Sequence, residues 1–211
     1  MYIPNYHAEN DLNTLQSLIA AHSLGAWVTL GADGLIANHI PFVLDRSGGE
    51  LGTLRGHVAR ANSVWQRLSL ELDSVVMFQG PHAYITPSWY PSRLSDGKVV
   101  PTWNYAVVHA HGRPRVIDDP QWMLQLLNDL TDHNEAGQPL PWRVGDAPPD
   151  FIAKLSRAVV GIEIPIRRLE GRWKLSQDEA MPDRLGTVAG LTALGDANSA
   201  ALSRLVSEQI K

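Results

Sequence analysis

The feature that most constrains the fold is the middle third of the chain, where aromatic residues, histidines and prolines are concentrated. Residues 78–90 and 100–109 contain more of them than a hydrophobic core requires. Proline fixes the backbone φ angle and removes an N–H donor, so strands in this region should have stiff ends that hold their side chains in place. The prolines concerned are Pro81, Pro87, Pro91 and Pro101. This combination is typical of a binding site built on β-strands.

Residues 102–111 alternate between two kinds of side chain, as expected of an extended strand. One face would carry Trp103, Tyr105, Val107, His109 and His111, and the other would carry Thr102, Asn104, Ala106, Val108 and Ala110. The small face would let a flat ring approach closely, with the Asn104 amide offering a donor and an acceptor. The bulky face could belong to the core or to a subunit interface.

Residues 53–63 form the best phosphate candidate, because a strand is expected to end there and a helix, 59–70, to begin. Exposed N–H groups and the positive end of the helix dipole favour an anion. Arg60 would supply the charge, His57 and Asn62 could donate hydrogen bonds, and Arg55 shares the strand face of His57. The alternative is that Arg60 is a solvated helix residue and His57 a strand-end histidine.

A metal site at His109 and His111 is a competing interpretation, since two imidazoles on one strand face are a recurrent chelating pair. Arg113 and Arg115 follow where a carboxylate ligand would be needed. Arginine beside a cation is electrostatically unfavourable, so we expect no metal.

The composition suits one compact domain, 1–211, with 44% hydrophobic residues. The chain has no cysteine, no basic leader and no apolar run long enough for a membrane helix, so we expect a cytoplasmic protein without membrane contact. The net charge of -4 gives no overall attraction for nucleic acid. Nucleophile elbows, P-loops and Rossmann glycine motifs are absent.

The periodicities predict a mainly β protein with peripheral helices and a C-terminal helical pair. Expected helices are 11–22, 59–70, 121–133, 184–194 and 198–210, and expected strands are 27–30, 35–44, 51–57, 74–79, 103–117 and 159–166. The first three strands should form a meander, with a hairpin turn at Asp33-Gly34. Residues 135–149 are rich in loop formers, but the apolar strand after them must join the same sheet, which argues against a linker.

Four segments, in this order, resemble the PaiB-type family of FMN-binding negative transcriptional regulators. They are Met1-Tyr2-Ile3-Pro4, residues 56–62, the middle block described above, and Trp173 to Gln177 with Asp183-Arg184. The resemblance implies an antiparallel split β-barrel with FMN as cofactor, assembled as a homodimer with flavin sites between subunits. It places Lys174, Ser176 and Gln177 near the ligand, although a surface turn would have the same composition. Trp103 and Asn104, on the strand expected over 102–111, are the further candidate flavin contacts.

The resemblance also implies a regulatory role, with DNA as a possible partner. The C-terminal helices, about 182–211, could pass for a helix-turn-helix, but Arg204 and Lys211 are the only cations of the second one. Packing on the barrel is the better interpretation, and we expect weak or no DNA binding. The alternative function is a flavin-dependent or heme-degrading oxidoreductase, with His57, His82 and Tyr84 as substrate-pocket groups.

Overall fold

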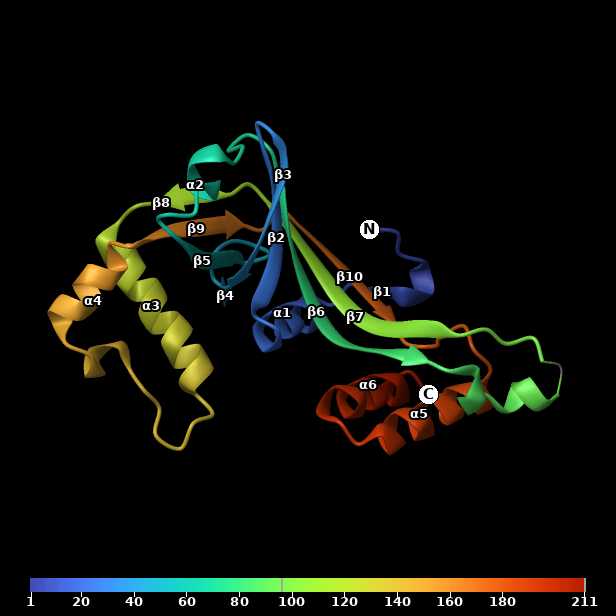
Figure 1. The fold of residues 1–211 in the computed structure, drawn as a ribbon. Helices are drawn as coiled ribbons and strands as arrows, with labels where there is room; N and C mark the ends of the chain where they lie inside the picture. The colour runs from blue at the N-terminus through green and yellow to red at the C-terminus, as the bar shows by residue number, and fades with distance from the viewer. Residues whose placement is uncertain (96, 211) are drawn as a thin grey trace. The chain divides into compact units, whose positions relative to one another are not determined.

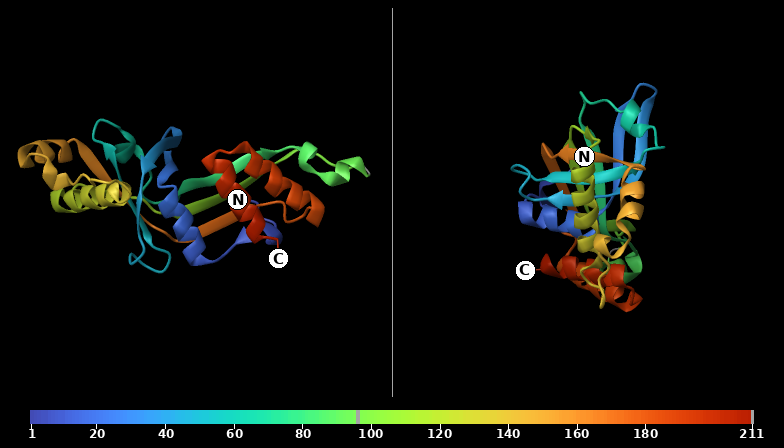
Figure 2. Two further views of the ribbon diagram at one scale, coloured as in Figure 1. Left: turned by 90° about the horizontal axis from the view of Figure 1, so that it is seen from below. Right: turned by 90° about the vertical axis from the view of Figure 1, so that its left-hand side faces the viewer.

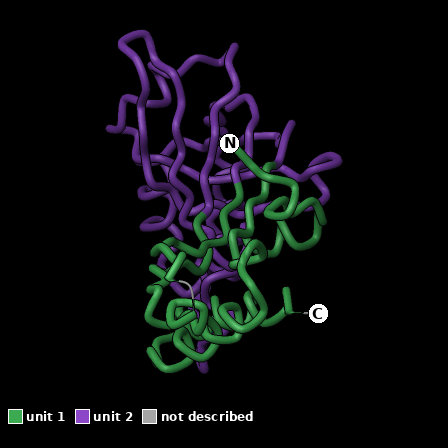
Figure 3. The backbone as a smooth tube through the Cα atoms, turned by 90° about the vertical axis from the view of Figure 1, so that its right-hand side faces the viewer, with its two compact units in different colours: residues 1–18, 79–108, 170–211 green, residues 19–78, 109–169 purple. Residues whose placement is uncertain are grey.

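The computed structural model describes residues 1–95 and 97–210 (Figure 1). The chain forms two compact units (Figure 3). Unit 1 consists of Met1–Leu18, Gln79–Val108 and Glu170–Lys211, and unit 2 consists of Ile19–Phe78 and His109–Leu169. The assignment of 1–211 to one domain stays a prediction.

The elements confirm a mainly antiparallel β protein with helices. The strands are β1 (Ala8–Glu9), β2 (Leu24–Gly31), β3 (Gly34–Pro41), β4 (Val43–Asp45), β5 (Thr53–Ala59), β6 (Ser74–Ile85), β7 (Thr102–Gly112), β8 (Arg115–Ile117), β9 (Val159–Pro165) and β10 (Arg168–Lys174). The α-helices are α1 (Leu12–Ala21), α2 (Val64–Arg67), α3 (Pro120–Glu135), α4 (Pro149–Ser156), α5 (Met181–Leu194) and α6 (Ala197–Glu208). The 3-10 turns are η1 (Asn5–His7), η2 (Pro87–Trp89), η3 (Pro91–Leu94) and η4 (Val144–Asp146).

The strands form two open sheets. One has the order β1-β10-β7-β6-β2-β3 and the other the order β4-β5-β9-β8. The hairpin expected at Asp33-Gly34 is confirmed, because β2 and β3 pair up to Gly31 opposite Gly34. The three-strand meander is confirmed only in part, because the strand expected over 35–44 is divided into β3 and β4, and β4 is the part that pairs with β5, in the second sheet.

In unit 2, helix α3 supplies a small core. Met123, Leu126 and Leu130 are buried, with Val43 and Val159 packed against them. The Asp119 carboxylate caps the helix by accepting a 2.8 Å hydrogen bond from the N–H of Trp122. The packing therefore joins α3 to residues of β4 and β9.

The helix expected over 59–70 is mostly wrong, because α2 spans only Val64–Arg67. The chain leaves the helical path after Arg67, and the N–H of Ser69 donates a hydrogen bond to the carbonyl of Leu30. A long-range backbone bond thus overrides local helix propensity. Helix α4 is an element that the sequence reading missed.

In unit 1, the alternation predicted for 102–111 is confirmed, and the small face is the core. Asn104, Ala106 and Val108 have no exposed surface, whereas 54% of Trp103 is exposed. Helices α5 and α6 lie side by side (Figures 1 and 2), and Leu191 is buried on α5. No helix within the described residues is both long and apolar enough to span a membrane.

Candidate functional site

The predicted site residues divide between the two units, and each group has its own surroundings. In unit 1, a buried hydrogen bond of 2.7 Å runs from Asn104 Nδ2 to Ser176 Oγ. Lys174 donates from Nζ to Thr102 Oγ1 at 2.5 Å and to the carbonyl of Trp103 at 3.0 Å. Strand β7 and the end of β10 are therefore linked by side chains that the sequence reading had placed near one ligand.

The turn after β10 holds its shape through Gln177. The Gln177 side chain accepts from the N–H of Leu175 at 2.7 Å and donates to the carbonyl of Trp173 at 2.6 Å. Ser176 is the non-glycine residue with a positive φ in the described chain, at 61°. Such a conformation is uncommon outside glycine and is often kept at functional sites. The Gln177 amide thus hydrogen-bonds to backbone groups and holds the turn that contains Ser176.

Unit 1 also buries polar atoms that lack a partner among the described residues. They include Asn104 Oδ1 and the Tyr90 hydroxyl. Burial, followed by the charge of Glu179, raises the pKa of Tyr90 to about 12. Ser176 and Thr187 lie near this hydroxyl and act in the opposite direction, although neither makes a well-formed hydrogen bond with it. Buried polar groups normally find a partner, so these atoms mark a place where water or a ligand could bind.

An exposed aromatic surface lies on the other face of β7. The rings of His82 and Trp103 stack at 6.4 Å with 26° between their planes. The Tyr84 ring meets Trp103 edge-on at 6.1 Å. Asn198 of α6 holds the backbone of His82, donating to its carbonyl at 2.7 Å. A half-exposed indole supported in this way can stack against a flat ligand.

Two basic groups of unit 1 are less easily charged than usual. Burial lowers the pKa of Lys174, while the charge of Asp178 opposes that shift. Burial likewise lowers the pKa of His7, whose two ring nitrogens have no partner among the described residues. Lys174 remains the cation of the group and can donate to an electron-rich ligand atom.

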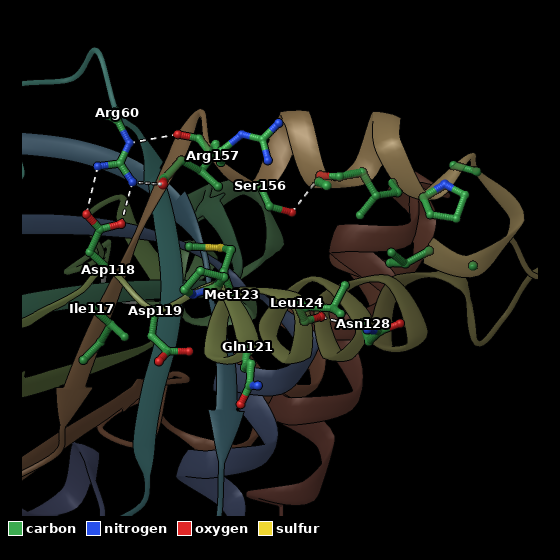
Figure 4. A pocket seen from close by; sticks show the side chains of 18 residues that line it. Arg60, Ile117, Asp118, Asp119, Gln121, Met123, Leu124, Asn128, Ser156 and Arg157 are labelled. Carbon is green, nitrogen blue, oxygen red and sulfur yellow. Dashed lines mark hydrogen bonds and ion pairs between the residues drawn. The ribbon is translucent and has the colours of Figure 1, made fainter.

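In unit 2, Arg60 lies at the rim of a pocket of about 640 Å³ (Figure 4). Its guanidinium group donates to both carboxylate oxygens of Asp118, at 2.6 and 3.0 Å. It also donates to the carbonyls of Arg157 at 2.9 Å and Val159 at 3.2 Å. These bonds use all but one of the N–H donors of a guanidinium group. The side-chain hydrogen bond from Arg60 lowers the pKa of Asp118.

The interior of this pocket is mainly apolar. Figure 4 shows Met123 and Leu124 of α3 on one side, and α4 contributes Ile152 and Ala153. The sequence reading missed the pocket because it missed α4. The spacing of Phe151, Ile152 and Leu155 was the signal that could have revealed that helix.

The two other phosphate candidates do not line this pocket. His57 faces Gly161 across the β5–β9 pair, and burial lowers its pKa. Asn62 donates to the Asn38 side chain at 2.8 Å and accepts from the N–H of Val64 at 3.0 Å. Arg55 pairs with Asp129 at 2.8 Å. Of the predicted phosphate group, Arg60 is the residue that lines this pocket.

The sequence matches a known family over most of its length. The family is described as "Putative FMN-binding domain", and the match covers residues 1–168. Helices α5 and α6 lie beyond the matched range.

Curated relatives cover nearly the whole chain. An uncharacterized protein of Emericella nidulans is 35% identical over 244 residues, which span 99% of this chain and 97% of that protein. The Bacillus subtilis protein named protease synthase and sporulation protein PAI 2 is 28% identical over 212 residues, spanning 100% of this chain and 99% of that protein.

Two solved structures share the fold. The flavocytochrome Anf3 of Azotobacter vinelandii has a TM-score of 0.59 and 14% identity, covering 82% of this chain and 72% of that chain. The FAD and heme binding protein of Mycobacterium smegmatis has a TM-score of 0.58 and 17% identity, covering 84% of this chain and 78% of that chain. At these identities the likeness concerns the fold alone.

Proposed function

The chain belongs to the FMN_bind_2 family of FMN-binding domains, and we propose that FMN is the flavin that it binds, within a homodimer of split-barrel subunits. The observation that carries the proposal is the group around Trp103 in unit 1. Trp103 carries an exposed indole, and its backbone carbonyl accepts a hydrogen bond from the partly buried ammonium group of Lys174. A flat, electron-poor ring with carbonyl oxygens at its edge matches both groups.

The unit 1 residues have two different roles in this proposal. Trp103 and Lys174 are accessible and contact the isoalloxazine ring. Asn104 and Ser176 are buried and keep β7 and the turn after β10 in place, together with Gln177. When bound, the flavin would supply redox chemistry, and Lys174 would stabilise negative charge at the ring edge.

Arg60 of unit 2 is proposed separately as a phosphate ligand, and this assignment does not depend on the ring assignment in unit 1. Asp118 accepts from two of the Arg60 N–H donors, and the carbonyls of Arg157 and Val159 accept from two more, so the phosphate must compete with that carboxylate. His57 and Asn62 then act by shaping the strand end and the following turn, and not by direct contact. Because Asp118 competes with the phosphate, removing the charge of Asp118 should strengthen FMN binding.

The assignment is tested by titrating the fluorescence of FMN, riboflavin and FAD with purified protein. Arg60→Ala should weaken FMN binding about tenfold or more, because a hydrogen bond to a charged group contributes on the order of 1.5–3 kcal/mol. Riboflavin, which lacks the phosphate, should bind the variant and the parent alike. Asp118→Asn should bind FMN as tightly as the parent or more tightly.

The matched control is Arg67→Ala, which removes another exposed arginine of unit 2 that is paired with an aspartate, Asp33. It should leave all three flavin affinities unchanged. An Arg60→Ala protein that binds FMN as tightly as the parent would refute the phosphate assignment and leave the ring assignment standing.

A flavin-dependent oxidoreductase is the second candidate, and the observation that favours it is the stacking of His82 on Trp103. An imidazole beside the proposed flavin surface could act as a general acid or base toward a substrate. Anaerobic mixing of the flavin-loaded protein with NADH or NADPH distinguishes the two functions. Loss of the flavin absorption band indicates an enzyme, and an unchanged band indicates a binding protein.

A role in gene regulation rests on the likeness to PaiB. Arg204 lies exposed on α6, and Lys211 is outside the described residues. Groove binding needs several cations on one helix, which α6 does not supply. We therefore expect any regulatory effect to act through flavin or a partner protein. Nanomolar, sequence-specific binding of the protein to a promoter fragment against excess competitor DNA would contradict this expectation.

A further inference from the structure

Three arginines of unit 2 gather at a second pocket, which is separate from the pocket beside Arg60. The cavity measures about 600 Å³, and Arg113, Arg115 and Arg167 line it together with Leu70, Pro114 and Pro165. We refer to it as the arginine pocket. None of these arginines belongs to the proposed flavin ligands.

The backbone brings the three arginines together by close contacts. At the end of β7, a Cβ atom on Gly112 would lie 2.2 Å from the carbonyl oxygen of Pro165, so only glycine allows this approach. The N–H of Arg167 donates to the carbonyl of His111 at 2.8 Å. Arg115 is fixed by the pairing of β8 with β9, opposite Glu163. These contacts therefore fix the backbone positions from which the three arginine side chains extend.

The charges in the arginine pocket do not balance. Arg167 and Arg113 share one carboxylate oxygen, Asp73 Oδ1, at 3.1 and 3.8 Å. Arg115 contacts Glu163 Oε1 at 3.3 Å. Three positive groups thus face two carboxylates, and most of their N–H donors remain available for a ligand. The whole chain carries a net charge of -4, so a general excess of basic residues does not explain this positive site.

We propose that the arginine pocket binds a small molecule through a phosphate-type oxyanion. The guanidinium fork matches the geometry of phosphate oxygens, and a group with more than one negative charge can replace Asp73 as the acceptor shared by Arg113 and Arg167. Leu70, Pro114 and Pro165 give the same pocket an apolar wall for the remainder of the ligand. This site goes beyond the proposed flavin function and does not depend on it.

The probe for this site is inorganic pyrophosphate, titrated into the full chain at low salt in a buffer without phosphate. Binding is followed by NMR through the arginine Nε–H signals. The parent should show saturable shifts, which weaken as chloride is added because the sites are exposed. Arg113→Gln and Arg167→Gln should each weaken pyrophosphate binding about tenfold. Asp73→Asn should strengthen it, since the competing carboxylate is neutralised.

The matched control is Arg204→Gln, an exposed arginine on α6, and its affinity for pyrophosphate should equal that of the parent. Equal weakening in this control, or no saturable shift in the parent at millimolar pyrophosphate, would overturn the proposal. A DNA duplex that binds the arginines where pyrophosphate does not would overturn it as well.

Each variant is also titrated with FMN. If Arg113→Gln or Arg167→Gln loses FMN, the pocket serves the flavin phosphate and a separate site is ruled out. If the parent binds pyrophosphate but no FMN, the proposed function fails and this inference stands.

Discussion

His57 is a partly buried imidazole whose surroundings link folding to pH. It lies opposite Gly161 in the β5–β9 pair, and the Trp122 ring of α3 occupies the space where a Cβ of Gly161 would project. Residues paired across strands share a face, so His57 lies on the face that α3 covers. Its Nδ1 atom has no partner among the described residues. Protonation there would place a charge without compensation.

We expect the protein to lose stability as the pH falls below about 6.5, the ordinary pKa of histidine. Because burial lowers the pKa of His57 in the folded state, the unfolded chain binds a proton in this range and the folded chain does not. The loss should continue down to the folded pKa. Burial also lowers the pKa of His7 and of His22, so both add to the loss of stability at low pH.

Urea unfolding at several pH values between 7.5 and 5 measures this effect. His57→Gln should flatten the dependence by up to about 1.4 kcal/mol per pH unit, the value for one proton. His39→Gln is the control, since that side chain is exposed on β3. A His57→Gln profile parallel to that of the parent would show that His57 does not couple folding to pH.

Among the elements, α5 shows how the C-terminal pair is attached within unit 1. A Cβ atom on Gly190 would lie 2.2 Å from Cδ2 of Trp89, so the indole packs directly on the helix backbone. Ser92 adds a hydrogen bond of 2.6 Å from its hydroxyl to the buried Asp183 carboxylate. The segment after β6 is thus clamped by α5.

Gly190→Val should therefore destabilise the fold by about 1–3 kcal/mol, the usual cost of overpacking. The Trp89 ring must move, so its fluorescence should change as well. Ala193→Val adds the same kind of branched side chain to an exposed position of α5 and should cost much less. Equal unfolding midpoints for the two variants would contradict this packing.

The elements that the sequence predicted well are those set by local signals. The alternation in 102–111 gave β7, and the C-terminal helices end and begin as expected at Gly195-Asp196, where Asp196 caps α6. The partner of Arg60 could not be predicted, because Asp118 lies 58 residues away. Likewise, no local pattern states that β5 joins β9 and not β3. Long-range pairing of this kind depends on the packing of the whole unit.

At the scale of the whole molecule, large apolar side chains remain exposed in both units. Leu94 is 84% exposed and Val100 73% in unit 1, and Leu140 is 91% exposed in unit 2. Exposed apolar groups gathered in patches mark interaction surfaces. In the homodimer that we propose, the partner subunit would cover some of these side chains.

Light scattering at micromolar concentration should give about twice the chain mass of 23.2 kDa. Added FMN should leave this mass unchanged or favour the dimer, if the flavin site includes both subunits. A single-chain mass with and without FMN would refute the dimer.

The most direct test of the central claim is a titration of FMN fluorescence with the parent protein and with Trp103→Ala. We predict saturable quenching by the parent, with one FMN per chain at the end point, and markedly weaker binding by the variant, because the exposed indole of Trp103 is lost. FAD should bind more weakly than FMN. Absence of saturable quenching by the parent, or full retention of FMN binding by Trp103→Ala, would contradict the account.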